Sequence, residues 1–156
     1  MTPEELPTVF AAFITRIEGK RLLVISRSER PLTPEQYLPA GASLEWLSDV
    51  QLADDMRAID RVDLSVVFDQ LEHMKKTEGV HLLSRLRDHY CNRVLLHCTD
   101  QVYSNRELLA LGFIEQKRPS SSGSFFLFDP DIFFEQRDWN TPDKWAHPEN
   151  FKKIRW

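Results

Sequence analysis

Apolar residues give the middle of the chain, from Val62 to Cys98, the pattern of a strand, a helix and a second strand. The segment VDLSVVF and residues 93–98 are almost continuously apolar, which is typical of strands that are covered on both faces in a parallel sheet. Between these runs, apolar residues recur at spacings of three and four and predict one helix face. They are Leu82, Leu83, Leu86 and Tyr90. We therefore expect one βαβ unit here.

Capping and turn residues mark further elements on both sides of this unit. Residues 2–17 begin with a hydroxyl, a proline and two acids, as helices often do, and their apolar face ends at Gly19. Ser104 and Glu107 predict a capping box at the start of a short helix. The other predicted elements are strands at 21–26 and 43–47, a helix at 49–59, and strands at 113–117 and 124–128 that are joined by the polar turn RPSSSG.

This order of elements predicts an α/β fold. Strands alternate with helices up to the final pair, so we expect a mainly parallel sheet that ends in an antiparallel hairpin. At 156 residues the chain is long enough for one domain with its own core and too short for two of ordinary size. We expect one domain over residues 1–138 and a Trp-rich extension, residues 139–156, that packs on it.

The composition is that of a globular protein, with 42% hydrophobic and 28% charged residues. The net charge of -4 gives no general attraction to nucleic acid, and no apolar stretch is long enough to cross a membrane. The first ten residues carry no Lys or Arg, so no targeting peptide is predicted and a cytoplasmic location is expected. Cys91 and Cys98 form no CxxC site and are expected to be reduced core thiols.

Several segments resemble the class I methyltransferase-like Rossmann fold. DLSVVFDQLEHM is similar to the fourth strand of that family and the loop after it, and HLLSRLRDHY, RVLLHC, LLALGF and SFFLFD continue the likeness. The resemblance implies a Rossmann-like, mainly parallel sheet with a C-terminal antiparallel hairpin. It also implies S-adenosylmethionine as a possible cofactor, but it says little about activity, because one fold serves many functions.

The loop after the first strand departs from this family pattern. In the family the loop is glycine-rich, because its backbone passes close to the methionine part of the cofactor. Residues 26–39 contain no glycine here, and Arg27 and Arg30 add bulk and charge. The acid that the family places at the end of strand two would be Glu45 or Asp49. We expect a site that is lost or rebuilt and holds no cofactor, with S-adenosylmethionine binding as the alternative.

The end of the chain resembles a second family, one of small bacterial proteins of unknown function. The segments WNTPDKW, HPENF and the final RW carry this likeness, which extends over roughly the whole chain. It implies no activity.

Asp69, Glu72 and His73 are the candidate catalytic residues. They follow directly on a predicted strand, at the end where open α/β sheets bind their ligands. A carboxylate beside a histidine is suited to acid and base catalysis or to metal binding. The alternative is that the two acids cap nearby backbone amides and His73 lies at the surface.

Arg27, Ser28 and Arg30 follow the first predicted strand at the same edge of the sheet. With Glu45 they are the candidate ligand-binding residues. Two guanidiniums and a hydroxyl can hold a phosphate or a carboxylate group. The alternative is that the arginines form salt bridges with neighbouring acids such as Glu45 and close the pocket.

Four histidines recur every eight residues, a spacing that suggests a metal site. They are His73, His81, His89 and His97. The predicted elements place them in a loop, a helix, a helix end and a strand, so the even spacing does not bring them together. Since the sequence has no CxxC or HExxH motif either, we predict no metal site. It also lacks the P-loop, GxGxxG and GxSxG motifs.

Trp139, Trp145 and Trp156 are the candidate partner-binding residues. WNTPDKW and WAHPENF repeat one pattern in which a proline and an acid precede an aromatic residue, and each can start a helical turn. We expect these rings to pack on the surface of the domain. The alternative is a docking surface for a protein partner, because Trp is enriched at binding hot spots.

Together these patterns favour a methyltransferase-like protein that is non-catalytic or divergent and acts by binding a small molecule or a protein partner. An active enzyme is the alternative. It would be a divergent S-adenosylmethionine-dependent methyltransferase, or another small-molecule enzyme of hydrolase-like activity, with Asp69, Glu72 and His73 near the substrate. A third hypothesis is an interaction subunit that recruits a protein through its Trp-rich tail.

Overall fold

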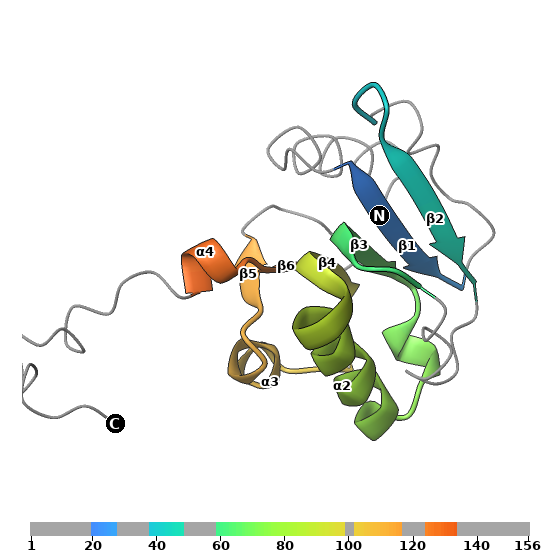
Figure 1. The fold of residues 1–156 in the computed structure, drawn as a ribbon. Coiled ribbons are helices and arrows are strands. Elements are labelled where there is room, and N and C mark those ends of the chain that lie inside the picture. Colours follow the sequence, from blue (N-terminus) through green and yellow to red (C-terminus); the bar gives the residue numbers. More distant parts are fainter. Residues whose placement is uncertain (1–19, 28–37, 49–58, 99–101, 117–123, 134–156) are drawn as a thin grey trace, which may run out of the picture.

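The computed structural model of the protein describes residues 20–27, 38–48, 59–98, 102–116 and 124–133 (Figure 1). Within these ranges, six strands form one sheet in the order β2-β1-β3-β4-β6-β5. The strands are β1 (Arg21–Ser26), β2 (Ser43–Leu47), β3 (Val62–Phe68), β4 (Cys91–Cys98), β5 (Ile114–Gln116) and β6 (Ser124–Phe128). The helical segments are η3 (Leu71–His73), α2 (Lys76–Arg85), η4 (Leu86–Tyr90), α3 (Asn105–Ala110) and α4 (Pro130–Phe133).

Most of the sheet is parallel. Strand β1 pairs in parallel with β2 and β3, and β3 pairs in parallel with β4. Strand β6 is antiparallel to both of its neighbours, β4 and β5. The α/β fold with a mainly parallel sheet and a C-terminal antiparallel hairpin is therefore confirmed. The predicted βαβ unit is also present, as β3, α2 with η4, and β4.

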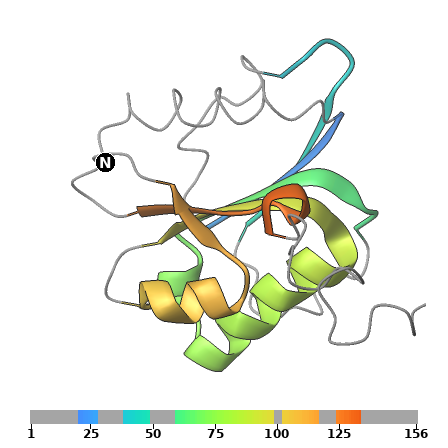
Figure 2. The same ribbon diagram turned by 90° about the vertical axis from the view of Figure 1, so that its left-hand side faces the viewer.

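Helices α2 and α3 lie on the same face of the sheet, as Figure 2 shows. The predicted apolar stripe of α2 and η4 is on the sheet side, where Leu82, Leu83 and Leu86 are fully buried. Strand β4 begins at Cys91, earlier than the predicted start at position 93. The reason is that η4 ends directly in extended backbone at Cys91, which pairs with Val62 of β3.

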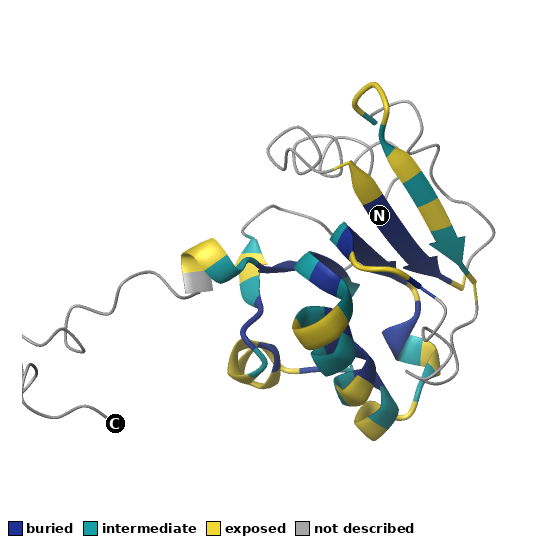
Figure 3. Ribbon diagram, viewed as in Figure 1, coloured by how far each residue is buried: buried dark blue, intermediate teal, exposed yellow. Residues whose placement is uncertain are grey.

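The central strands are buried along most of their length (Figure 3), and apolar side chains pack on both of their faces. On the helix-covered face these are Leu23, Ile25, Val67, Val94 and Leu96. On the other face they are Leu22, Val24, Leu64, Val66 and Leu95. This two-sided burial explains why β1, β3 and β4 are almost continuously apolar in the sequence. The edge strand β2 is only partly buried and alternates instead.

The start of α3 has the predicted capping box, and it is tied to α2. The hydroxyl of Ser104 accepts a hydrogen bond from the Glu107 amide at 3.3 Å, and the Glu107 carboxylate accepts one from the Ser104 amide at 2.9 Å. The same carboxylate forms a 2.5 Å ion pair with Lys76 at the start of α2. These contacts satisfy amides at the helix end and hold the two helices together.

Some predictions fall outside the described residues. They concern the helix at 2–17, the helix at 49–59 except for Ile59, the candidate residues Asp49, Ser28 and Arg30, and the extension with Trp139, Trp145 and Trp156. Cys91 and Cys98 are described, and both are buried free thiols as predicted. None of the helices in the described ranges has the length and apolar character needed to span a membrane.

Candidate functional site

The carboxyl ends of β1 and β3 meet at one edge of the sheet. Ser26 is aligned with Phe68, so the two strands end side by side. Strand β2, which follows β1 in the chain, lies on one side of β1, and β3 lies on the other side. This is the topological switch point, where open α/β sheets bind ligands. Arg27 and Asp69 directly follow the two strands, as the sequence predicts.

Asp69 adopts an uncommon backbone conformation at this edge. Its φ angle is +45°, and it is the one non-glycine residue with a positive φ among those the structure describes. Aspartate tolerates this left-handed region better than most side chains, and such conformations concentrate at functional sites. The turn allows the chain to leave β3 and enter η3, with Leu71 fully buried beneath it.

Asp69 and His73 form a pair across this turn. Oδ1 of Asp69 and Nε2 of His73 are 3.3 Å apart, and the side chains are 49% and 43% exposed. A carboxylate that orients an imidazole is an arrangement suited to proton transfer, and both groups are accessible to a ligand. The predicted catalytic pair is therefore brought together by the structure.

Glu72 and Gln70 point toward the protein interior from the same turn. Gln70 is almost completely buried, with 1% of its surface exposed. Glu72 is partly buried, and its Oε2 is shielded from solvent. The turn thus presents an exposed carboxylate, Asp69, and a shielded one, Glu72, to the end of the sheet.

His97 is a further residue of this site. It lies near the end of β4, where the pairing of Val67 with Leu96 places it beside Phe68. Its ring lies 6.1 Å from that of Phe68 and 5.0 Å from that of Phe125. Nε2 of His97 is buried and has no hydrogen-bond partner within the described part of the chain.

The electrostatics of His97 link it to the η3 turn. Burial lowers the pKa of its imidazole, and the negative charges of Glu72 and Asp69 partly offset this effect. The lowered pKa favours the neutral ring, in which one ring nitrogen is a hydrogen-bond acceptor and the other a donor. The groups at this edge are therefore the exposed pair of Asp69 and His73, the shielded carboxylate of Glu72 and the buried, neutral ring of His97.

The sequence interpretation missed His97. It considered this residue only as one of four evenly spaced histidines, and that spacing has no structural meaning. The usable signal was its position. His97 is one residue from the end of the predicted strand at 93–98, and Asp69 follows the other strand of the same predicted βαβ unit. Residues at the carboxyl ends of adjacent parallel strands converge at the same edge of the sheet.

The remaining predicted residues lie in different places. Glu45 is exposed in the middle of β2, opposite Leu23, and does not lie at the carboxyl end of the strand. Arg27 is exposed just beyond β1. His81 lies on α2, where its Nε2 accepts a hydrogen bond from Arg85 at 3.4 Å. Across the described ranges, no three His, Cys, Asp or Glu side chains are grouped closely enough to hold a metal ion.

Several solved structures with a similar fold are methyltransferases or were determined in the presence of S-adenosylhomocysteine. Magnesium protoporphyrin IX methyltransferase from Synechocystis PCC 6803, with bound S-adenosylmethionine, is 13% identical at a TM-score of 0.55, over 81% of this chain and 76% of its own. The N-terminal domain of EvdMO1, studied with S-adenosylhomocysteine and D-fucose, is 13% identical at a TM-score of 0.57, over 80% of each chain.

A third similar structure is a larger protein. It is a phosphoethanolamine N-methyltransferase from Haemonchus contortus, 7% identical at a TM-score of 0.56, over 91% of this chain and 42% of its own. At these identities the likenesses show the fold alone, which is methyltransferase-like as predicted.

Comparison of the sequence with family models gives the family directly. No curated protein matches the sequence. The model of the family of unknown function DUF6231 matches residues 4–156, which is nearly the entire chain. The chain therefore belongs to this family.

Proposed function

We propose that this protein is a methyltransferase-like protein that acts by binding a small molecule at the carboxyl edge of β1 and β3, without transferring a methyl group. The observation that carries the proposal is the Asp69 and His73 pair, 3.3 Å apart on a left-handed turn at the topological switch point. Strained backbone at the ligand end of an α/β sheet points to a binding role.

The side chains at this edge favour a ligand with hydroxyl or amino groups. The exposed carboxylate of Asp69 accepts hydrogen bonds when it is ionised, and the exposed ring of His73 beside it offers a second polar group. A ligand that donates hydrogen bonds, such as a polyol or an amine, complements this set. The rings of Phe68 and Phe125, which flank His97, are buried in the core and fix the position of the imidazole.

The residues present do not fit S-adenosylmethionine in the way that the methyltransferase family holds it. Glu45 lies in mid-strand, away from the carboxyl edge where ribose hydroxyls would bind, and Asp49, the other candidate acid, lies outside the described residues. Residues 26–39 also contain no glycine to permit close approach of the backbone to the cofactor. We therefore derive no catalytic step from this cofactor.

Two experiments test the proposal. Calorimetry with S-adenosylmethionine and with S-adenosylhomocysteine should give no saturable heat. A thermal-shift screen of polyols, amines and nucleosides should give a ligand whose stabilising effect is lost in Asp69→Asn and His73→Gln. The matched control is His81→Gln, on α2, which should bind the ligand as the wild type does. Saturable binding of either cofactor form would overturn the non-catalytic proposal.

A divergent methyltransferase is the second candidate. The observation that favours it is the shared fold with proteins solved in complex with S-adenosylmethionine or S-adenosylhomocysteine, at TM-scores above 0.5. In that case Asp69, Glu72 and His73 would contact the methyl acceptor. Transfer of a radiolabelled methyl group to any acceptor, lost in Asp69→Asn, would establish it.

A further inference from the structure

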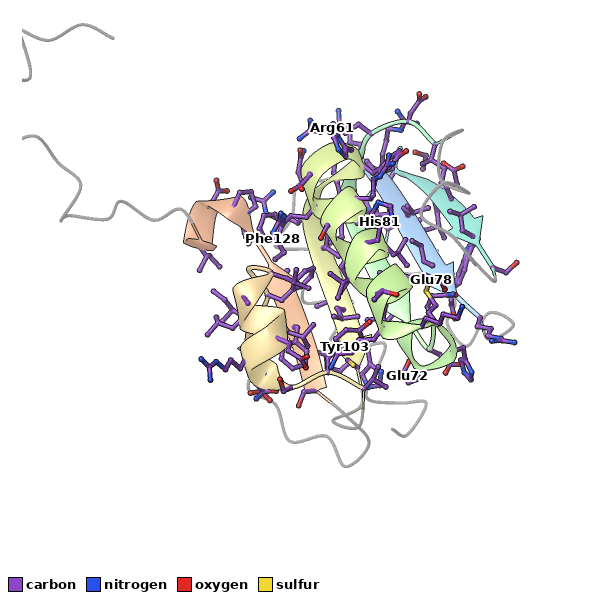
Figure 4. All side chains as sticks on the ribbon, turned by 90° about the horizontal axis from the view of Figure 1, so that it is seen from below. Arg61, Glu72, Glu78, His81, Tyr103 and Phe128 are labelled. Atoms are coloured by element: carbon purple, nitrogen blue, oxygen red, sulfur yellow. The ribbon has the colours of Figure 1, made fainter. Side chains whose placement is uncertain are left out.

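A pocket lies at the opposite edge of the sheet, by the amino ends of β3 and β4. Its volume is about 430 Å³, within the ~300–1,000 Å³ range of small-molecule sites. Arg61 precedes β3, Asn92 is in β4, and Phe128 ends the antiparallel strand β6. Figure 4 shows Arg61 and Glu72 near opposite ends of α2, so this pocket is separate from the site of Asp69 and His73.

Arg61 provides a positive charge that the described residues do not neutralise. Its Nε and Nη2 donate hydrogen bonds to Oδ1 of Asn92 at 3.2 and 2.9 Å, and it forms no ion pair with a described residue. The contact orients the planar guanidinium. Nη1 of Arg61 and the side-chain nitrogen of Asn92, Nδ2, have no hydrogen-bond partner among the described residues. Since both residues line the pocket, they supply it with two neighbouring donors and one full charge.

The second arginine of the pocket is already neutralised. Arg87 donates two hydrogen bonds to the Asp88 carboxylate at 2.6 and 3.1 Å, and a third to the carbonyl of Leu111 at 2.8 Å. The hydrogen bond from Arg87 lowers the pKa of Asp88, which keeps that carboxylate ionised and paired. The guanidinium also lies 5.8 Å from the centre of the Phe128 ring. Arg87 therefore forms a wall of the pocket and holds this ring in place.

The rest of the lining is uncharged. Cys91 is buried, and burial raises the pKa of its thiol to about 12, against a smaller opposing effect of the Arg61 charge. The thiol is neutral at ordinary pH. Phe128 and Pro130 supply the apolar lining. One unneutralised cation beside an apolar wall is complementary to a monoanion with an apolar body.

We propose that this pocket binds a small organic carboxylate. Its carboxylate group accepts hydrogen bonds from Arg61 and Asn92, and its apolar body packs against Phe128 and Pro130. A carboxylate matches the planar fork of a guanidinium and carries the single negative charge that Arg61 offsets. The proposal is independent of any ligand at the carboxyl edge of the sheet.

Amide-detected NMR titration of the full chain tests the proposal with four probes: benzoate, 2-naphthoate, neutral benzamide and inorganic phosphate. Benzoate should shift the side-chain amide of Asn92 and the backbone amides of Cys91 and Phe128 in a saturable way. 2-Naphthoate should bind more tightly, because it fills more of the 430 Å³. Benzamide should bind far more weakly, because it lacks the charge.

Two variants and a control complete the experiment. Arg61→Gln should weaken benzoate binding about tenfold or more, because a charged hydrogen-bond donor is lost. The benzoate affinity of Arg61→Lys should lie between those of the wild type and Arg61→Gln, since lysine keeps the charge but lacks the planar fork of the guanidinium. Arg106→Gln, the same change at an exposed position on α3, should leave binding unaltered. If Arg61→Gln does not fold, Asn92→Ala takes its place, with weaker benzoate binding expected.

Three results would overturn the proposal. They are the absence of saturable shifts at the pocket, equal benzoate affinity in wild type and the folded Arg61→Gln variant, and equal affinity for benzamide and benzoate. Phosphate binding at the pocket in preference to benzoate would overturn the assignment to carboxylates and identify an inorganic anion site.

Discussion

The hydroxyl of Tyr103 occupies the space that a side chain at Gly79 would need. A Cβ atom at Gly79 would collide with this oxygen and would also lie 3.3 Å from a methyl carbon of Leu71. The hydroxyl is held there by its 3.1 Å hydrogen bond to the carbonyl of Lys76. Glycine is otherwise unfavourable inside a helix, so its presence in α2 is explained by this close approach.

Gly79→Ala should destabilise the protein despite the better helix propensity of alanine. Both partners of the clash are buried, so the Tyr103 ring or α2 must shift, and such overpacking costs about 1–3 kcal/mol. Urea unfolding should show a lower midpoint with an unchanged slope.

A double mutant separates this clash from a general effect of the substitution. Tyr103→Phe removes the oxygen and leaves the added Cβ about 3.3 Å from the ring carbon, a tight but tolerable contact. Adding Gly79→Ala to Tyr103→Phe should therefore cost at least ~1 kcal/mol less than adding it to the wild type. Additive effects would contradict the proposed contact.

The ion pair of Glu107 should make stability depend on acid pH. The hydrogen bond from Lys76 and those from Ser104 lower the pKa of Glu107 from its ordinary 4.5 to about 2. Between these values the unfolded chain binds more protons, so this stabilisation is complete above pH 4.5 and is lost as the pH falls toward 2. Urea unfolding at several pH values should show wild type and Glu107→Gln converging over this interval. The stability of Lys76→Met should converge with that of the wild type over the same interval. A stability difference that stays constant with pH would show that the ion pair is not the cause.

The left-handed backbone at Asp69 should be visible in the stability of its variants. Alanine in this region costs roughly 1–2 kcal/mol, whereas glycine adopts it freely and asparagine tolerates it. We expect Asp69→Ala to be the least stable variant, Asp69→Asn to be near wild type, and Asp69→Gly to be about 1 kcal/mol more stable than the alanine variant. Equal stability of the alanine and glycine variants in urea would contradict the φ of +45°.

The Cys91 thiol should be inert in the folded protein. It is 1% exposed, and burial raises its pKa to about 12, so both access and the reactive thiolate are lacking. In a Cys98→Ser background, the remaining thiol should react with a disulfide reagent only after unfolding in guanidinium. Rapid labelling of the native variant would show that this part of the sheet opens.

Local sequence patterns were sufficient for the elements with local causes. The apolar runs of β3 and β4 result from burial on both faces of the sheet, and the sequence shows them directly. The capping box of Ser104 and Glu107 requires only residues three positions apart. Asp69 and His73 were found for a similar reason, because they follow a recognisable strand end and lie on one short turn.

Long-range packing decided the features that the sequence did not reveal. His97 joins the site because β4 lies between β3 and the antiparallel β6, which places its ring between Phe68 and Phe125. Arg61, Asn92 and Phe128 line one pocket for the same reason. No local periodicity encodes the order of strands in a sheet, because that order depends on which distant segments bury each other's apolar faces. The sequence by itself therefore determined the strands of the sheet and the place of Asp69 and His73 after a strand end, and only the tertiary structure brought together the groups that surround each site.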